Sequence, residues 1–103
     1  MKIVKVTYTA KAGYAEQNQN NIKNVMADLR ELNHPGIFYH VCLGPNGRSF
    51  THTAFFSSDE AEGILLKLPP FVHFQQQLKA FGLETPPKQE LLTLVGSSTD
   101  IFN

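Results

Sequence analysis

Residues 36–57 read GIFYHVCLGPNGRSFTHTAFFS, two runs rich in β-branched and aromatic residues on either side of a turn segment. Such residues favour strands, and Asn46-Gly47 between the runs is a strong signal for a β-hairpin. A two-residue turn there gives the hairpin a nearly apolar face made of Ile37, Tyr39, Val41, Leu43, Phe50, His52, Ala54 and Phe56. The opposite face carries Phe38, His40, Cys42, Thr51, Thr53 and Phe55. We expect the first face to pack beneath helices.

The rest of the chain supplies a strand and a helix on each side of this hairpin. Residues 2–10 are rich in β-branched residues and predict a strand, and residues 14–33 carry apolar residues at helical spacing. A second helix is predicted to begin near Ser58, break at Pro69-Pro70 and end at Gly82. Residues 88–96 predict a fourth strand, and residues 97–103 predict a flexible tail.

The order β-α-β-β-α-β predicts one α+β domain over residues 1–103, with a ferredoxin-like, four-stranded antiparallel sheet and two helices on one face. The other face then carries Ile3, Phe38, Cys42, Phe55 and part of the 88–96 run. A sheet face open to water is normally polar. We therefore expect a second copy of the chain to cover it, giving a homodimer.

Composition limits what the protein can bind. The 103 residues include nine basic and nine acidic side chains, and without a basic cluster we expect no nucleic-acid partner. No run approaches the roughly 18 apolar residues that a membrane helix needs. The single cysteine, Cys42, fits a reducing cytosol, so a cytoplasmic protein is predicted. His40 and His52 lie on opposite faces with no carboxylate at ligand spacing, so no metal site is expected within one subunit. No other cofactor is expected either.

Two segments carry a resemblance to a known family. Residues 55–61 read FFSSDEA, a strand end that runs into a helix with an acidic first turn, and residues 70–75 read PFVHFQ after the proline break. With these features the chain resembles the dimeric α/β-barrel superfamily, which includes small antibiotic biosynthesis monooxygenases and stress-responsive barrel proteins. The resemblance implies two sheets packed face to face, helices outside, and a ligand cleft between sheet and helices. It does not fix the reaction, because this fold hosts many.

The resemblance also makes one activity unexpected. Haem-degrading members use an asparagine, a tryptophan and a histidine at places where this chain has Thr7, Ile64 and Gln75. The chain contains no tryptophan. We therefore do not expect haem degradation.

His52 is the leading candidate for a catalytic residue. It lies on the apolar face of the hairpin, where an ionisable ring needs a partner. Two interpretations are open: a core histidine bonded to a tyrosine or a backbone carbonyl, or a general base or orienting donor for a ligand. Tyr39, on the same face, and His73, just after the proline break, are the other candidate catalytic residues.

Aromatic side chains supply the remaining candidates. Phe71 and Phe74 repeat at helical spacing, and with the helix-facing Phe56 they are candidate ligand-binding residues, with core packing as the alternative. His40, Phe38 and Phe55 lie on the opposite face and are predicted to line the barrel lumen or the dimer contact.

Two functions from different classes fit these observations. The first is a cofactor-independent, monooxygenase-like enzyme acting on an aromatic or quinone-like molecule, which requires a pocket beside His52. The second is a non-catalytic, small-ligand-binding or stress-related dimer, which requires only an apolar cleft. Whether the chain is an enzyme is left open by the sequence.

Overall fold

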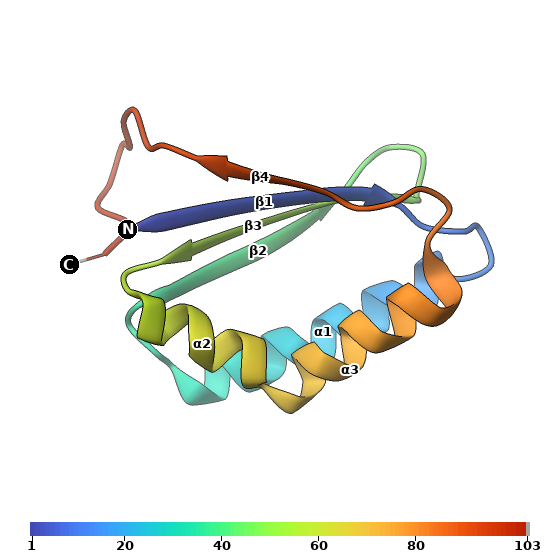
Figure 1. The fold of residues 1–103 in the computed structure, drawn as a ribbon, viewed down its shortest axis with the longest axis horizontal. Coiled ribbons are helices and arrows are strands. Elements are labelled where there is room, and N and C mark those ends of the chain that lie inside the picture. The colour runs from blue at the N-terminus through green and yellow to red at the C-terminus, as the bar shows by residue number, and fades with distance from the viewer. Residues whose placement is uncertain (103) are drawn as a thin grey trace.

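The computed structural model describes residues 1–102 and has the predicted order of elements. Strands β1 (Lys2–Thr9), β2 (Ile37–Leu43), β3 (Ser49–Phe56) and β4 (Lys88–Leu92) form one antiparallel sheet in the order β2-β3-β1-β4. Helix α1 (Ala15–Leu32) makes the first crossover. Figure 1 shows all the helices on one side of the sheet, which confirms the α+β, ferredoxin-like prediction.

The second crossover is divided more finely than predicted. It contains α2 (Asp59–Lys67), α3 (Pro69–Gln77) and a short π-helical segment, η1 (Leu78–Gly82). Between α2 and α3, Leu68 has an extended backbone (φ −65°, ψ 123°) because a residue before proline avoids the helical region. None of the helices in residues 1–102 is long and apolar enough to cross a membrane.

The hairpin has the predicted register but a different turn. Leu43 pairs with Phe50, as a two-residue turn would require. The Gly47 N–H donates to the Gly44 carbonyl oxygen at 3.0 Å, and Gly47 alone in this turn has a positive φ, of 75°. The loop is therefore longer than a two-residue turn at Asn46-Gly47: the Gly44 N–H donates to the Ser49 carbonyl oxygen at 2.7 Å, so residues 45–48 form a four-residue loop, which gives the same register.

The C-terminal part of the chain also differs from prediction. β4 ends at Leu92, not at residue 96, and residues 93–102 contain no helix or strand. The apolar residues beyond it, Leu94 and Val95, are exposed. Asn103, the last residue of the predicted tail, lies outside the described residues.

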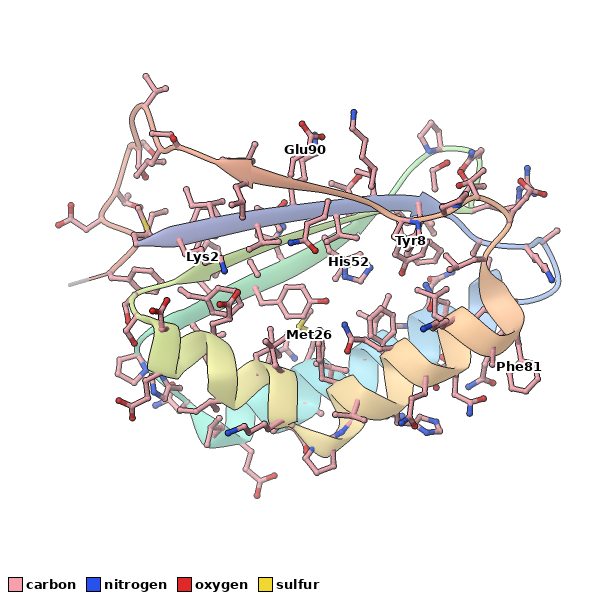
Figure 2. The ribbon with its side chains drawn as sticks, viewed as in Figure 1. Lys2, Tyr8, Met26, His52, Phe81 and Glu90 are labelled. Atoms are coloured by element: carbon pink, nitrogen blue, oxygen red, sulfur yellow. The ribbon has the colours of Figure 1, made fainter. Side chains whose placement is uncertain are left out.

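The core lies between the sheet and the helices. Its most buried large side chains are Phe50 of β3 and Val25 of α1, with exposed fractions of 2% and 1%. In the described part of the chain no helix covers the other face of the sheet, and Glu90 projects from that face in Figure 2. The helical layer therefore excludes water from one face of the sheet and leaves the other face open to solvent.

We predict opposite effects of alanine at two glycines of the second crossover. A Cβ at Gly82 would overlap the Tyr14 ring, whereas a Cβ at Gly63 of α2 would meet nothing within 4 Å. Overpacking should make Gly82→Ala less stable by about 1–3 kcal/mol. The matched Gly63→Ala should gain about 0.5–1 kcal/mol, because glycine is unfavourable inside a helix. Urea unfolding of both variants measures the difference, and a neutral Gly82→Ala would contradict the packing described.

Candidate functional site

A cavity of about 650 Å³ lies between the sheet and the second crossover. Its walls come from all four strands and from α2, α3 and η1, so it forms only once the fold is complete. Most of the lining is apolar, from Val6, Leu65, Phe71, Phe74, Leu78, Leu83 and Pro87. A space of this size, with few polar groups, is typical of sites for small organic ligands.

The polar groups deep in this cavity belong to one hydrogen-bonded cluster centred on His52. The Nε2 atom of His52 lies 2.7 Å from the Tyr8 hydroxyl, and its Nδ1 atom lies 2.6 Å from the Tyr39 hydroxyl. Figure 2 shows Tyr8 and His52 directed from the sheet toward the helices. His52 is only 5% exposed, yet its ring and both tyrosines line the cavity. Both interpretations of His52 are thus compatible with its position: it is bonded to tyrosines and it borders a cavity.

Aromatic rings of α3 cover this cluster. The ring of Phe74 stacks on that of His52, with centroids 5.3 Å apart and an interplanar angle of 30°. The ring of Phe71 meets that of Tyr39 edge-on at 6.2 Å. These contacts fix the orientation of the imidazole and present a flat aromatic wall to any bound molecule.

Burial keeps the cluster uncharged. Loss of water lowers the pKa of His52 to about 4, so its imidazole is neutral at pH 7. Burial also raises the pKa of Tyr39 and of Tyr8, and the hydrogen bond from Asn18 only partly offsets this for Tyr8. The two neutral phenols and the neutral imidazole hold three hydrogens, of which two are used within the cluster, so one remains to donate to an anionic ligand without the cluster carrying charge.

The solvent end of the cavity is polar. Gln75, Gln76, Lys79 and Gln89 line it and are exposed, so they lie where the cavity meets water. Within residues 1–102, no carboxylate is among the lining side chains, and Lys79 is the one cation there. No group of three or more His, Cys, Asp or Glu side chains in the described chain could hold a metal ion. The electrostatics of this entrance favour neutral or anionic ligands.

The structure brings together four of the predicted site residues. His52, Tyr39, Phe71 and Phe74 all line the cavity. The structure places Phe56 elsewhere, in the core with 3% of its surface exposed and outside the cavity lining.

The structure also places His73 away from the cavity. This side chain is exposed and is absent from the cavity lining. The reason is helical geometry: Phe71 and Phe74, three residues apart, share the buried face of α3, and His73 lies on the opposite, exposed side of the helix.

The predicted lumen residues gather on the opposite face of the sheet. The rings of Phe38 and Phe55 stack with centroids 5.4 Å apart, and the His40 ring lies 5.5 Å from that of Phe38. Phe38 is 44% exposed, and His40 and Cys42 are exposed as well. Ile3, expected on the open face, is already buried within the single chain.

Two members of the cluster were not foreseen from the sequence. Tyr8 is 6% exposed, and Asn18 of α1, fully buried, donates from Nδ2 to the Tyr8 hydroxyl at 2.8 Å. The spacing of Asn18 from apolar residues of the same helix could have indicated that it is buried. It precedes Ile22 by four residues and Val25 by seven, which places it on the buried stripe of α1 despite its polar neighbours.

No protein-family model matches the chain, and no curated protein sequence matches it. Solved structures do match. An antibiotic biosynthesis monooxygenase has a TM-score of 0.77 at 13% identity, covering 93% of this chain and 100% of that one. Rv0793 from Mycobacterium tuberculosis has a TM-score of 0.77 at 12% identity, covering 95% of this chain and 98% of that one. SnoaB, a cofactor-independent oxygenase from Streptomyces nogalater, has a TM-score of 0.67 at 16% identity, covering 96% and 98%.

The chain has the fold of the antibiotic biosynthesis monooxygenase-like proteins. The resemblance inferred from residues 55–61 and 70–75 is confirmed at this level. TM-scores of 0.67–0.77 at identities of 12–16% show a shared fold alone, and the chemistry must be argued from the residues of the cavity.

We predict that His52 makes stability fall in mild acid. Its pKa is about 4 in the folded chain, against about 6.5 in an unfolded one, so between these values the unfolded chain binds more protons. The contribution of His52 is complete above pH 6.5 and declines as the pH falls toward 4, by about 3 kcal/mol at about 1.4 kcal/mol per pKa unit.

Urea unfolding between pH 7 and pH 4 tests this expectation. His52→Gln should lose less stability over that range than the unmodified protein, whereas His73→Gln, changed at an exposed site, should behave like the unmodified protein. Parallel pH curves for His52→Gln and the unmodified protein would show that His52 does not titrate as described.

Proposed function

We propose that this protein is an enzyme that oxidises an aromatic or quinone-like small molecule with dioxygen and without a bound cofactor. The observation that carries the proposal is the cluster of His52 and Tyr39 at the inner end of an otherwise aromatic and aliphatic cavity. The fold supports it, since one structure with this architecture is described as a cofactor-independent oxygenase.

The cavity suits the binding step of such a reaction. The rings of Phe71 and Phe74 supply a wall for a flat substrate, and the polar cluster can orient an oxygen of that substrate. A pKa of about 4 makes His52 a weak base at neutral pH. We therefore assign Tyr39, with His52 hydrogen-bonded behind it, to orienting the substrate and stabilising negative charge on its oxygen, and we assign neither residue to removing a proton.

The proposed reaction balances without another reductant. A methylene carbon activated by neighbouring aromatic rings becomes a carbonyl carbon. One oxygen atom of dioxygen bonds to this carbon, and the other leaves as water with the two hydrogens. One of these hydrogens first leaves the substrate as a proton to water and is returned when the water molecule forms. The substrate supplies all the electrons, so its anion must be electron-rich, and hydrogen bonds that hold the anion in place are the protein's main contribution.

We predict that turnover depends on the cluster and not on His73. A screen of phenolic and quinone-like aromatics by thermal shift identifies ligands, and oxygen uptake with ¹⁸O₂ identifies substrates by one labelled oxygen in the product. Tyr39→Phe and His52→Ala should lower the rate by roughly tenfold or more, as loss of a hydrogen-bond donor to a developing anion does. His73→Ala, altered at an exposed position, should keep the full rate.

Two results would contradict the enzyme. If a compound binds in the cavity but no screened ligand is oxidised, the protein is a small-ligand-binding protein. If oxidation occurs at the normal rate in His52→Ala and Tyr39→Phe, the reacting site lies elsewhere.

We also propose that the chain works as a homodimer in a reducing compartment such as the cytosol. Support for the dimer comes from the helix-free face, where Phe38 and Leu92 are 44% and 41% exposed. Burying such rings against a second copy removes apolar surface from water, and a net charge of zero avoids repulsion between the copies. Support for the compartment comes from Cys42, an exposed free thiol.

A pair of phenylalanine variants tests the dimer. Phe38→Glu should convert a dimer of 11.5 kDa chains into monomers, because it places a charge in the proposed contact. Phe81→Glu is the control, since Phe81 of η1 is 62% exposed and projects away from the sheet (Figure 2). Sedimentation equilibrium measures the masses, and a monomeric unmodified protein at micromolar concentration would refute the dimer.

A further inference from the structure

Asn18, Tyr8, His52 and Tyr39 form one continuous chain of hydrogen bonds. The bonds span 2.8 Å from Asn18 to Tyr8, 2.7 Å from Tyr8 to His52 and 2.6 Å from His52 to Tyr39. The first three side chains are nearly inaccessible, with exposed fractions of 0%, 6% and 5%. Only Tyr39 is half-buried. The series of hydrogen bonds therefore begins at the inaccessible Asn18, its closed end, and finishes at Tyr39, which lines the cavity.

The number of polar hydrogens on these side chains limits which groups can donate and which must accept in the series of hydrogen bonds. A neutral imidazole has one N–H and one bare nitrogen, and each phenol has one O–H. The two contacts of the His52 ring use two of these three hydrogens. One phenol therefore donates to His52, the other accepts from it, and the accepting phenol keeps its own hydrogen for another partner.

The closed end decides which phenol donates. The Asn18 amide donates to the Tyr8 oxygen, so the hydroxyl hydrogen of Tyr8 is directed to His52 Nε2. In the reverse arrangement His52 would donate to Tyr8, and the Tyr8 hydrogen would find no acceptor among the other described side chains. A buried donor without an acceptor costs about 1–3 kcal/mol.

Rotation of the Asn18 amide would not rescue the reverse arrangement. It would offer Tyr8 an acceptor but leave both amide hydrogens buried without partners. The observed orientation leaves the Oδ1 atom of Asn18 and one of its two amide hydrogens without a partner, which is one unpaired N–H fewer. Protein interiors tolerate an unpaired carbonyl oxygen more readily than unpaired N–H groups.

We propose that Asn18 is a positioning residue that, through Tyr8, holds His52 in its Nδ1–H tautomer and leaves the Tyr39 hydroxyl hydrogen free for the cavity. Asn18 does not line the cavity and acts only through the two side chains between. Within residues 1–102 the Tyr39 hydroxyl has no other hydrogen-bond partner. The Tyr39 hydroxyl therefore presents a hydrogen-bond donor at the inner end of the cavity.

A donor at this position selects the ligand. A molecule that fills the cavity must bring an acceptor oxygen, such as an aryl ketone or a phenolate, to the Tyr39 hydroxyl. This consequence rests on the proposed function, because it assumes that the cavity binds an aromatic ligand. The tautomer of His52 does not depend on it.

Nitrogen NMR of the ¹⁵N-histidine-labelled protein tests the tautomer directly, since a protonated and a bare ring nitrogen have different shifts. We expect His52 to carry its hydrogen on Nδ1, whereas a neutral histidine in water favours Nε2. An Nε2–H tautomer in the unmodified protein would overturn the proposal. The measurement needs no ligand and no turnover, so it can succeed or fail independently of the enzyme activity.

Asn18→Asp tests the role of Asn18 in the same spectrum. Once ionised, as the ¹³C shift of its carboxyl reports, the new side chain can only accept, so Tyr8 should turn to it and His52 should change to Nε2–H. While the acid is protonated it can donate as the amide does, and the original tautomer should persist. Retention of Nδ1–H beside an ionised carboxylate would overturn the role of Asn18.

Two further measurements complete the test. Asn21→Asp is the matched control, because Asn21 is also buried on α1 but bonds to Tyr14 and Gln17, and it should leave His52 unchanged. For the ligand, 9-fluorenone should bind about three- to tenfold more weakly to Tyr39→Phe, the effect of one hydrogen bond, whereas fluorene should bind both proteins equally. Equal loss for the two probes would contradict a donor at Tyr39.

Discussion

An imidazole removed from water must find its hydrogen-bond partners inside the protein, and the centre of this molecule is arranged around that requirement. His52 sits on the covered face of the sheet, and partners reach it from β1 and β2 on its two sides. Asn18 extends the network into α1, so the polar chain also ties the sheet to the helical layer. A buried hydrogen-bonded network of this kind favours one arrangement of the core.

The cavity beside His52 follows from how the helical layer is divided. The prolines after Leu68 end α2 and start α3 in a new direction, so one long helix does not cover the sheet. α3 then continues into η1, and π-helical segments of this sort recur at functional sites. The result is an apolar space whose inner end can form hydrogen bonds and whose entrance, within residues 1–102, is lined by no carboxylate. This combination favours a flat molecule with an acceptor oxygen over a cation.

The two faces of the sheet give the molecule two distinct surfaces. The covered face holds the cavity and the His52 cluster, and the helix-free face holds the ring cluster around Phe38. Strand alternation alone separates them, since neighbouring residues of β2, Tyr39 and Phe38, point to opposite sides. A dimer formed through the second surface would therefore leave the first open to ligands, and the two proposals can be tested separately.

The sequence by itself determined the order of strands and helices, the register of the hairpin and the face on which His52 lies, because these depend on local alternation and on Asn-Gly and proline signals. It could not show that Phe56 packs in the core while Phe71 and Phe74 line a cavity, since all three are aromatic residues on the buried faces of their elements. Only the tertiary structure decided which polar groups meet. Asn18 and Tyr8 join His52 from distant parts of the chain, and hydrogen bonds between such segments leave no periodic trace in the sequence.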